Sequence, residues 1–250
     1  MFLQALSLLF AAVLSLGGAY RPAWALPDES AGDYVILLHG LGRTHRSMHA
    51  LEERLAGEGF QVINLDYPSR RYPIEQLAGI LKQRIEQNCT AEEKRIHFVT
   101  HSLGGMILRS YIQQNRPERL GRVVMLCPPS SGSELVDVAG ASWLFEWLNG
   151  PAGSQLGTDS SSFPQRLAPV DFELGVITGD KSLNPFYSLF IPGKDDGKVS
   201  VDRAKVAGMA DFLVLPHSHT FIMSSPETAG QVLYFLRNGR FLKNGREQHD

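Results

Sequence analysis

The sequence has little cysteine and almost no net charge, and each shortage excludes a class of protein. Only Cys89 and Cys127 are present, too few for the disulfide framework of a small secreted domain. They could pair with each other outside the cytosol or remain as two half-buried thiols. A formal net charge of −2 gives no sign of the basic surface that binds nucleic acid. With 250 residues and 43% hydrophobic content, the chain can bury one large core, so a single domain is expected.

Internal repeats, heptad patterns and zinc-binding motifs are absent as well. A metal-dependent hydrolase would need a ligand set such as His-Glu-x-x-His. The sequence offers only the pair His217 and His219, with no carboxylate cluster to complete a site. We therefore expect no metal ion, no cofactor and no nucleic-acid partner.

Residues 1–25 have most features of an export signal. The run 2–16 is almost entirely apolar but short for a bilayer span. Ala23-Trp24-Ala25 supplies the small residues that a signal peptidase requires before its cleavage site. No Lys or Arg precedes the apolar run, so an uncleaved N-terminal anchor is the alternative. We expect an exported protein, periplasmic or secreted, that is membrane-anchored if this segment is retained. Residues 26–250 then form the single domain.

Apolar runs alternate with segments of helical spacing through most of the chain. The runs are typical of buried strands, and the segments between them place their apolar residues on one side of a helix. This alternation predicts an α/β fold with about six parallel strands, right-handed crossovers and helices on both faces. The expected strands are 34–38, 61–65, 96–100, 122–126, 172–179 and 212–215.

The alternation breaks over residues 128–171, which are rich in Gly, Ser and Pro. A long irregular insertion in a compact domain is usually functional or disordered, and the aromatic residues here argue against disorder. The insertion either packs on the core or forms a lid and an acyl-binding wall. Its candidate substrate-binding residues are Trp143, Phe145, Trp147 and Leu148.

The segment 96–107 is the most informative part of the chain. A β-branched and aromatic run turns sharply at Ser102 and continues as a helix rich in glycine and leucine, the layout of a nucleophile elbow. Such a turn lifts the hydroxyl clear of the sheet and aims the amide of Leu103 at the same point. Thr100 stands where the usual Gly-x-Ser-x-Gly pattern has glycine, so crowding between strand and helix is expected. A buried strand with an incidental serine is the alternative.

Two later strands are followed by residues that would complete this chemistry. The loop 180–197 carries acidic residues after the fifth expected strand, and His217 and His219 follow the sixth. The carboxyl ends of parallel strands meet at one edge of a sheet, so these side chains can converge on Ser102. The His-Gly-Leu-Gly segment 39–42 leaves the first strand at the same edge, where its glycines let an amide turn toward the serine.

Four short motifs make the chain resemble a small lipase or esterase of the α/β-hydrolase superfamily, near the triacylglycerol-lipase and inositol-deacylase-like group. They are His-Gly-Leu-Gly at 39–42, Thr-His-Ser-Leu-Gly-Gly at 100–105, Asp-Gly-Lys-Val-Ser at 196–200 and Ser-His-Thr-Phe at 218–221. The resemblance implies a minimal α/β-hydrolase fold with a lid-like insertion. It implies Ser102 as nucleophile, Asp196 as orienting acid and His219 as general base. The amides of Leu41 and Leu103 are implied as the oxyanion hole.

Both the acid and the base have rivals nearby. Asp195 adjoins Asp196, and Asp180 lies nearer the fifth strand, but the Asp-Gly-x-Val spacing favours Asp196. His217 shares a loop with His219, which matches the family position just before Thr-Phe. The histidines of the 39–42 and 100–105 motifs are expected to pack and hydrogen-bond near the site rather than transfer protons.

The resemblance implies hydrolysis of a carboxylic ester through an acyl-enzyme intermediate. A thioesterase, an acyltransferase and a non-catalytic binding protein on the same scaffold stay open as alternatives. If the aromatic cluster of the insertion faces the site, the substrate carries an acyl chain rather than a sugar or peptide. The expected partner is a small-molecule or lipid ester, and peripheral contact with a membrane and the oligomeric state are left open.

Overall fold

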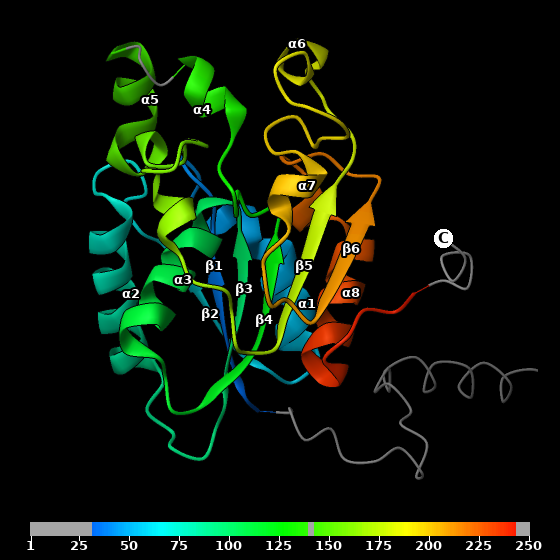
Figure 1. The fold of residues 1–250 in the computed structure, drawn as a ribbon. Coiled ribbons are helices and arrows are strands. Elements are labelled where there is room, and N and C mark those ends of the chain that lie inside the picture. Colours follow the sequence, from blue (N-terminus) through cyan, green and yellow to red (C-terminus); the bar gives the residue numbers. More distant parts are fainter. Residues whose placement is uncertain (1–31, 140–142, 244–250) are drawn as a thin grey trace, which may run out of the picture.

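The computed structural model describes residues 32–139 and 143–243, with side chains described except at 139–148. The expected export segment, 1–25, lies outside the described residues. Six parallel strands form one sheet in the order β2-β1-β3-β4-β5-β6 (Figure 1). The six parallel strands confirm the predicted α/β fold. Parallel neighbours need long crossover connections, and the helices between the strands provide them. The strands are β1 (Tyr34–Leu38), β2 (Gln61–Leu65), β3 (Ile96–His101), β4 (Leu120–Leu126), β5 (Leu174–Gly179) and β6 (Asp211–Leu215).

Two helices cover each face of the sheet. Successive side chains of a strand point to opposite faces, so the continuous apolar run of β1 serves two cores. Ile36 and Leu38 pack in the cluster that holds α2 and α3, whereas Val35 and Leu37 pack in the cluster that holds α1 and α8. These four helices are α1 (His49–Gly57), α2 (Ile74–Asn88), α3 (Leu103–Asn115) and α8 (Pro226–Asn238).

Further helices gather beyond the carboxyl ends of the strands (Figure 1). The insertion 128–171 supplies α4 (Glu134–Ala139) and α5 (Trp143–Ser154), and α6 (Pro185–Ser188) and α7 (Val201–Ala204) follow β5. The described part of the chain also contains three 3-10 helices, at His45–Met48, Phe163–Arg166 and Ile222–Ser224. No helix within the described ranges is long and apolar enough to cross a membrane.

The described parts of the insertion lie beyond the edge of the sheet where the motifs lie (Figure 1). Within α5 the backbone kinks at Gly150, whose φ is 69° and where a side chain would overlap the carbonyl oxygen of Arg70. The side chains of Trp143, Phe145, Trp147 and Leu148 are not among the described residues. Movement of the insertion as a lid therefore stays a prediction.

Helix α3 approaches the sheet closely at Gly104. A Cβ there would lie 2.7 Å from the carbonyl oxygen of Leu38 and 2.9 Å from that of His39. Both atoms belong to the backbone, which cannot rotate away as a side chain would. Glycine at this position therefore sets the distance between the elbow and the first strand.

We predict that Gly104→Ala lowers the free energy of unfolding by about 1–3 kcal/mol, because the methyl group forces α3 off the sheet. Gly79 is the matched control, since it lies in α2 and an added methyl group would have nothing within 4 Å. Gly79→Ala should instead raise stability by up to about 1 kcal/mol. Urea unfolding measures both, and equal effects from the two substitutions would contradict the prediction.

Candidate active site

Ser102 occupies a strained backbone position between β3 and α3. Its φ is 53° and its ψ is −120°, a region that non-glycine residues rarely adopt. The turn is held by two backbone bonds, from Ser102 N to the oxygen of Leu126 at 2.9 Å and from Gly105 N to the oxygen of Ser102 at 2.9 Å. The sharp turn predicted for the elbow is therefore present.

The expected crowding at Thr100 is relieved by the helix that crosses it. Thr100 is fully buried, and its Oγ1 would lie 3.3 Å from a Cβ at Gly105. The missing side chain of Gly105 leaves room for the threonine hydroxyl. A small residue on the helix thus compensates for the departure from glycine on the strand.

Three side chains distant in the sequence form one chain of hydrogen bonds. His219 Nε2 lies 3.0 Å from Ser102 Oγ, and His219 Nδ1 lies 2.8 Å from Asp196 Oδ2. They come from the end of β3, the loop after β5 and the loop after β6, in the order that the motifs predict. A base within hydrogen-bond reach of a hydroxyl, itself oriented by an acid, is the geometry that activates a serine.

Asp196 is held in its ionised form. Burial raises its pKa, but the charge of His219 and hydrogen bonds from His219, Cys127 and Val199 outweigh burial and leave the pKa below its usual value. Oδ1 accepts the amides of Lys198 and Val199, each at 2.9 Å. The carboxylate can therefore fix the His219 tautomer with Nδ1 protonated and Nε2 free to accept a proton.

Cys127 is a neighbour of this pair that sequence reasoning did not assign to the site. It follows β4 with a φ of 48°, and it is a free, buried cysteine, as is Cys89. Burial and the charge of Asp196 raise the pKa of the Cys127 thiol well above its usual value, so the thiol keeps its proton and can donate it to the carboxylate. Cys127 follows β4 and Asp196 lies in the connection after β5, so the pairing of these two strands brings the thiol and the carboxylate together.

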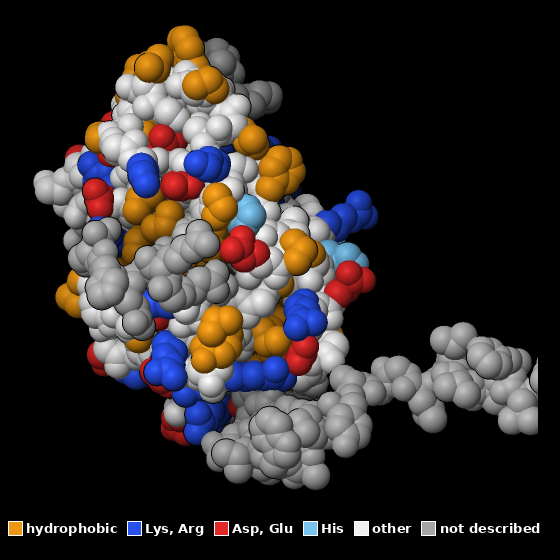
Figure 2. Space-filling view, turned by 90° about the vertical axis from the view of Figure 1, so that its right-hand side faces the viewer, with side chains coloured by type: hydrophobic (Ala, Val, Ile, Leu, Met, Phe, Trp, Pro, Cys, Tyr) orange, Lys and Arg blue, Asp and Glu red, His pale blue; other side chains and the backbone are white. Residues whose placement is uncertain are grey.

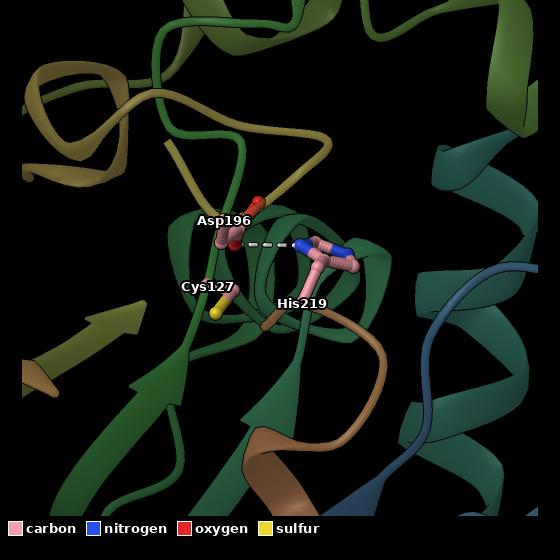
Figure 3. A group of neighbouring side chains, drawn as sticks. All are labelled: Cys127, Asp196 and His219. Carbon is pink, nitrogen blue, oxygen red and sulfur yellow. Dashed lines mark hydrogen bonds and ion pairs between the residues drawn. The ribbon is translucent and has the colours of Figure 1, made fainter. Parts of the chain in front are cut away.

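The ligand atoms of Cys127, Asp196 and His219 lie within 4.8 Å of one another (Figure 3). Sulfur, carboxylate and imidazole could in principle hold a transition metal. Here the hydrogen bond between Asp196 and His219 and the protonated thiol account for the same atoms. The arrangement is explained as an orienting network without a metal.

His101 supports the backbone of His219. Its Nε2 donates to the carbonyl oxygen of His219 at 2.9 Å, and the two ring centres are 4.9 Å apart. Burial lowers the pKa of His101 well below its usual value, so the ring stays neutral. His39 is also buried, and it stacks on Tyr67 with 4.0 Å between ring centres. Both histidines lie near the site as structural groups.

The rival residues have other partners. Asp195 Oδ1 accepts the hydroxyl of Ser188 at 2.9 Å and the amide of Gly197 at 2.7 Å, so it braces its own loop. Asp180 lies 3.8 Å from the Lys181 ammonium. His217 Nε2 bonds Ser225 Oγ at 2.8 Å, away from the serine. Geometry favours Asp196 and His219 over all three.

A cavity of about 390 Å³ opens beside Ser102 and His219. Leu41 lines it, and Leu103 begins the helix that follows the serine, so both predicted oxyanion donors lie at the site. Their role as donors stays a prediction. Most other lining residues are apolar and come from both sides of the opening; they include Pro129, Leu135, Val136, Val138, Leu156, Tyr187, Phe190 and Val199.

The rim on the α6 side is an apolar surface that sequence reasoning missed. Leu189 is 76% exposed and Phe186 67%, and Leu183, Tyr187 and Phe190 are exposed beside them. Figure 2 shows hydrophobic side chains at the end of the molecule where α6 lies. The signal was available as an apolar run inside a Pro- and Gly-rich connection, but the run has neither strand nor helix periodicity.

Comparison with known families gives one match over most of the chain. A family model described as "Alpha/beta hydrolase family" matches residues 35–228. No curated protein matches the sequence.

Solved structures share the fold at low sequence identity. The mature lipase BlEst2 of Bacillus licheniformis is similar with a TM-score of 0.66 and 19% identity, over 85% of this chain and 95% of that one. The phospholipase PlaB of Legionella pneumophila has a TM-score of 0.67 and 20% identity, over 84% of this chain and 60% of PlaB. A metagenomic carboxyl esterase, MGS0156, has a TM-score of 0.62 and 20% identity, over 77% of this chain and 66% of that one.

We predict that Asp196→Asn slows covalent modification of Ser102 by a fluorophosphonate by about 10²- to 10⁴-fold, because the amide no longer holds the required imidazole tautomer. Asp195→Asn is the control and should slow modification less than about tenfold, since its carboxylate touches only its own loop. Labelling rates measured by mass spectrometry test this. A larger loss in Asp195→Asn than in Asp196→Asn would show that Asp196 is not the orienting acid.

Proposed function

Because the chain belongs to the alpha/beta hydrolase family, we propose that it is a serine hydrolase that cleaves carboxylic esters through an acyl-enzyme intermediate. The observation that carries the proposal is the chain of hydrogen bonds from Ser102 through His219 to Asp196. Ser102 and His219 line a largely apolar cavity. Attack on an ester carbonyl needs a serine activated by a base, and this geometry supplies one.

In the proposed first step, His219 Nε2 takes the Ser102 proton as Oγ attacks the carbonyl carbon. The amides of Leu41 and Leu103 stabilise the oxyanion that forms. His219 then protonates the leaving alcohol, which departs and leaves an acyl group on Ser102. In the second step, His219 activates a water molecule that hydrolyses the acyl-enzyme, while Asp196 stabilises the imidazolium each time it forms.

The apolar cavity supports an ester with an acyl chain. Leu135, Val136 and Leu156 line one side, and Tyr187 and Phe190 reach the other. The names of similar structures, a lipase, a phospholipase and a carboxyl esterase, support the same class of substrate. The predicted export signal would place this activity outside the cytoplasm, and the exposed α6 rim fits peripheral contact with lipid.

We predict that Ser102→Ala lowers ester turnover by about three orders of magnitude or more and abolishes fluorophosphonate labelling, because the attacking oxygen is lost. His217→Ala serves as control and should keep most activity, since His217 bonds Ser225 and lies away from the serine. Turnover of p-nitrophenyl butyrate, with peptide mapping of the label, measures both. Full activity in Ser102→Ala would end the proposal.

We also predict that kcat/KM rises along a series of p-nitrophenyl esters from acetate to medium-length acyl chains. Each added methylene that is buried contributes about 0.8 kcal/mol of transfer free energy, so gains of a few-fold per methylene are expected until the cavity is filled. Val136→Trp, which narrows the cavity, should move the optimum to shorter chains. A sharp preference for acetate in the unmodified protein would contradict an acyl-binding role for the cavity.

A further inference from the structure

We infer that the active-site cavity contains a binding site for an anionic group, a phosphate or carboxylate carried by the ester substrate, formed by Arg43 and Lys198. The inference rests on the proposed ester hydrolysis and specifies its substrate class. Both residues line the cavity that also exposes Ser102 and His219. Arg43 directly follows the 39–42 segment that holds the predicted oxyanion donor, and Lys198 lies two residues beyond Asp196.

Neither cation has an acidic partner among the described residues. Two other basic side chains at this end of the molecule are paired, Arg203 with Glu134 and Lys194 with Asp180. In the described part of the chain, no carboxylate lies within 4.0 Å of the charged atoms of Arg43 or Lys198. The cavity residues whose side chains are described include no aspartate or glutamate.

The two cations act on each other. Burial lowers the pKa of Lys198, and the positive charge of Arg43 lowers it further. Asp196 opposes this shift, but its oxygen atoms already accept bonds from His219 and from two backbone amides. Both side chains are exposed at the mouth of the cavity, where water screens them, but two like charges side by side without a counter-ion still repel each other. An anionic ligand would remove this cost, so the arrangement fits a site completed by its substrate.

The chemistry of the pair identifies the ligand. Guanidinium binds phosphate and carboxylate oxygens through two parallel hydrogen bonds, and ammonium adds a point charge. The remaining lining residues are largely apolar and suit a hydrocarbon chain. The best substrate is therefore an amphiphilic ester whose anionic group lies close to the scissile bond, on either the acyl or the alcohol side.

Two matched pairs of substrates test the inference and separate these sides. On the acyl side, p-nitrophenyl butyrate is compared with mono-p-nitrophenyl succinate, which replaces the terminal methyl group by a carboxylate. On the alcohol side, a monoacylglycerol is compared with the corresponding acylglycerol phosphate. In the unmodified protein, the anionic ester of at least one pair should have a kcat/KM about tenfold or more above its neutral partner. This ratio should fall as salt is added.

Arg43→Gln and Lys198→Gln should each lower that ratio about five- to tenfold, and the double variant should bring it to about one or below. Lys194→Gln makes the same charge change four residues from Lys198 on an exposed, paired side chain, so the ratio should not change. Thermal unfolding confirms that each variant is folded. A ratio near one for both pairs in the unmodified protein, or a preference that survives in the double variant, would overturn the inference.

Failure of the proposed hydrolysis gives a different result, namely no turnover of any ester, neutral or anionic. The anion site is then judged by calorimetric titration of monobutyl phosphate into the unmodified protein and the double variant. Binding that is lost in the double variant supports the site, and equal binding or no binding to both proteins overturns it.

Discussion

The carboxylate of Asp196 is the point at which the loops of the carboxyl edge are joined. One oxygen bonds His219, and the other accepts two amides of its own loop. The backbone is tied as well, because the amide of His219 donates to the carbonyl oxygen of Asp196 at 2.9 Å. His101, at the end of β3, holds the carbonyl oxygen of His219 in turn. The loops after β5 and β6 are thereby fixed relative to the end of β3 and to Ser102, as the proposed reaction requires.

Two strained residues lie on either side of this junction. Ser102 and Cys127 are the non-glycine residues with positive φ in the described chain, and each follows the end of a central strand. Strain of this kind persists only where surrounding contacts determine the conformation, and it gathers at functional sites. Here the strain lifts one side chain toward the cavity and turns the other toward the acid. The sheet supplies the rigidity, since β3 and β4 are buried between two layers of helices.

The fold and the order of the candidate site residues along the chain could be predicted because both depend on local patterns. Apolar runs such as 34–38 and helical spacing such as that of α8 are readable one segment at a time, and parallel topology then brings their ends together. Choosing Asp196 over Asp195 needed a motif, since adjacent carboxylates differ only in the direction they point. The contact of Cys127 with Asp196 depends on strand register and backbone strain, which no local pattern reports. Arg43 and Lys198 are far apart in the sequence, so their proximity in one cavity could not be predicted from local patterns either. The exposed apolar residues around Phe186 have neither helix nor strand periodicity, so the sequence did not reveal them.

Because both cysteine thiols are buried, their reactivity reports local unfolding of the protein. Cys127 lies at the centre of the sheet edge and is fully buried, whereas Cys89 lies at the end of α2 and is 6% exposed. An alkylating reagent can reach them only when the surrounding layers part, so its rate of incorporation counts opening events. Modification at residue 127 would report separation of the loops around the acid, and modification at residue 89 would report fraying of a peripheral helix. Comparison of the two rates would show whether local opening costs more free energy at the centre of the sheet edge than at the end of α2.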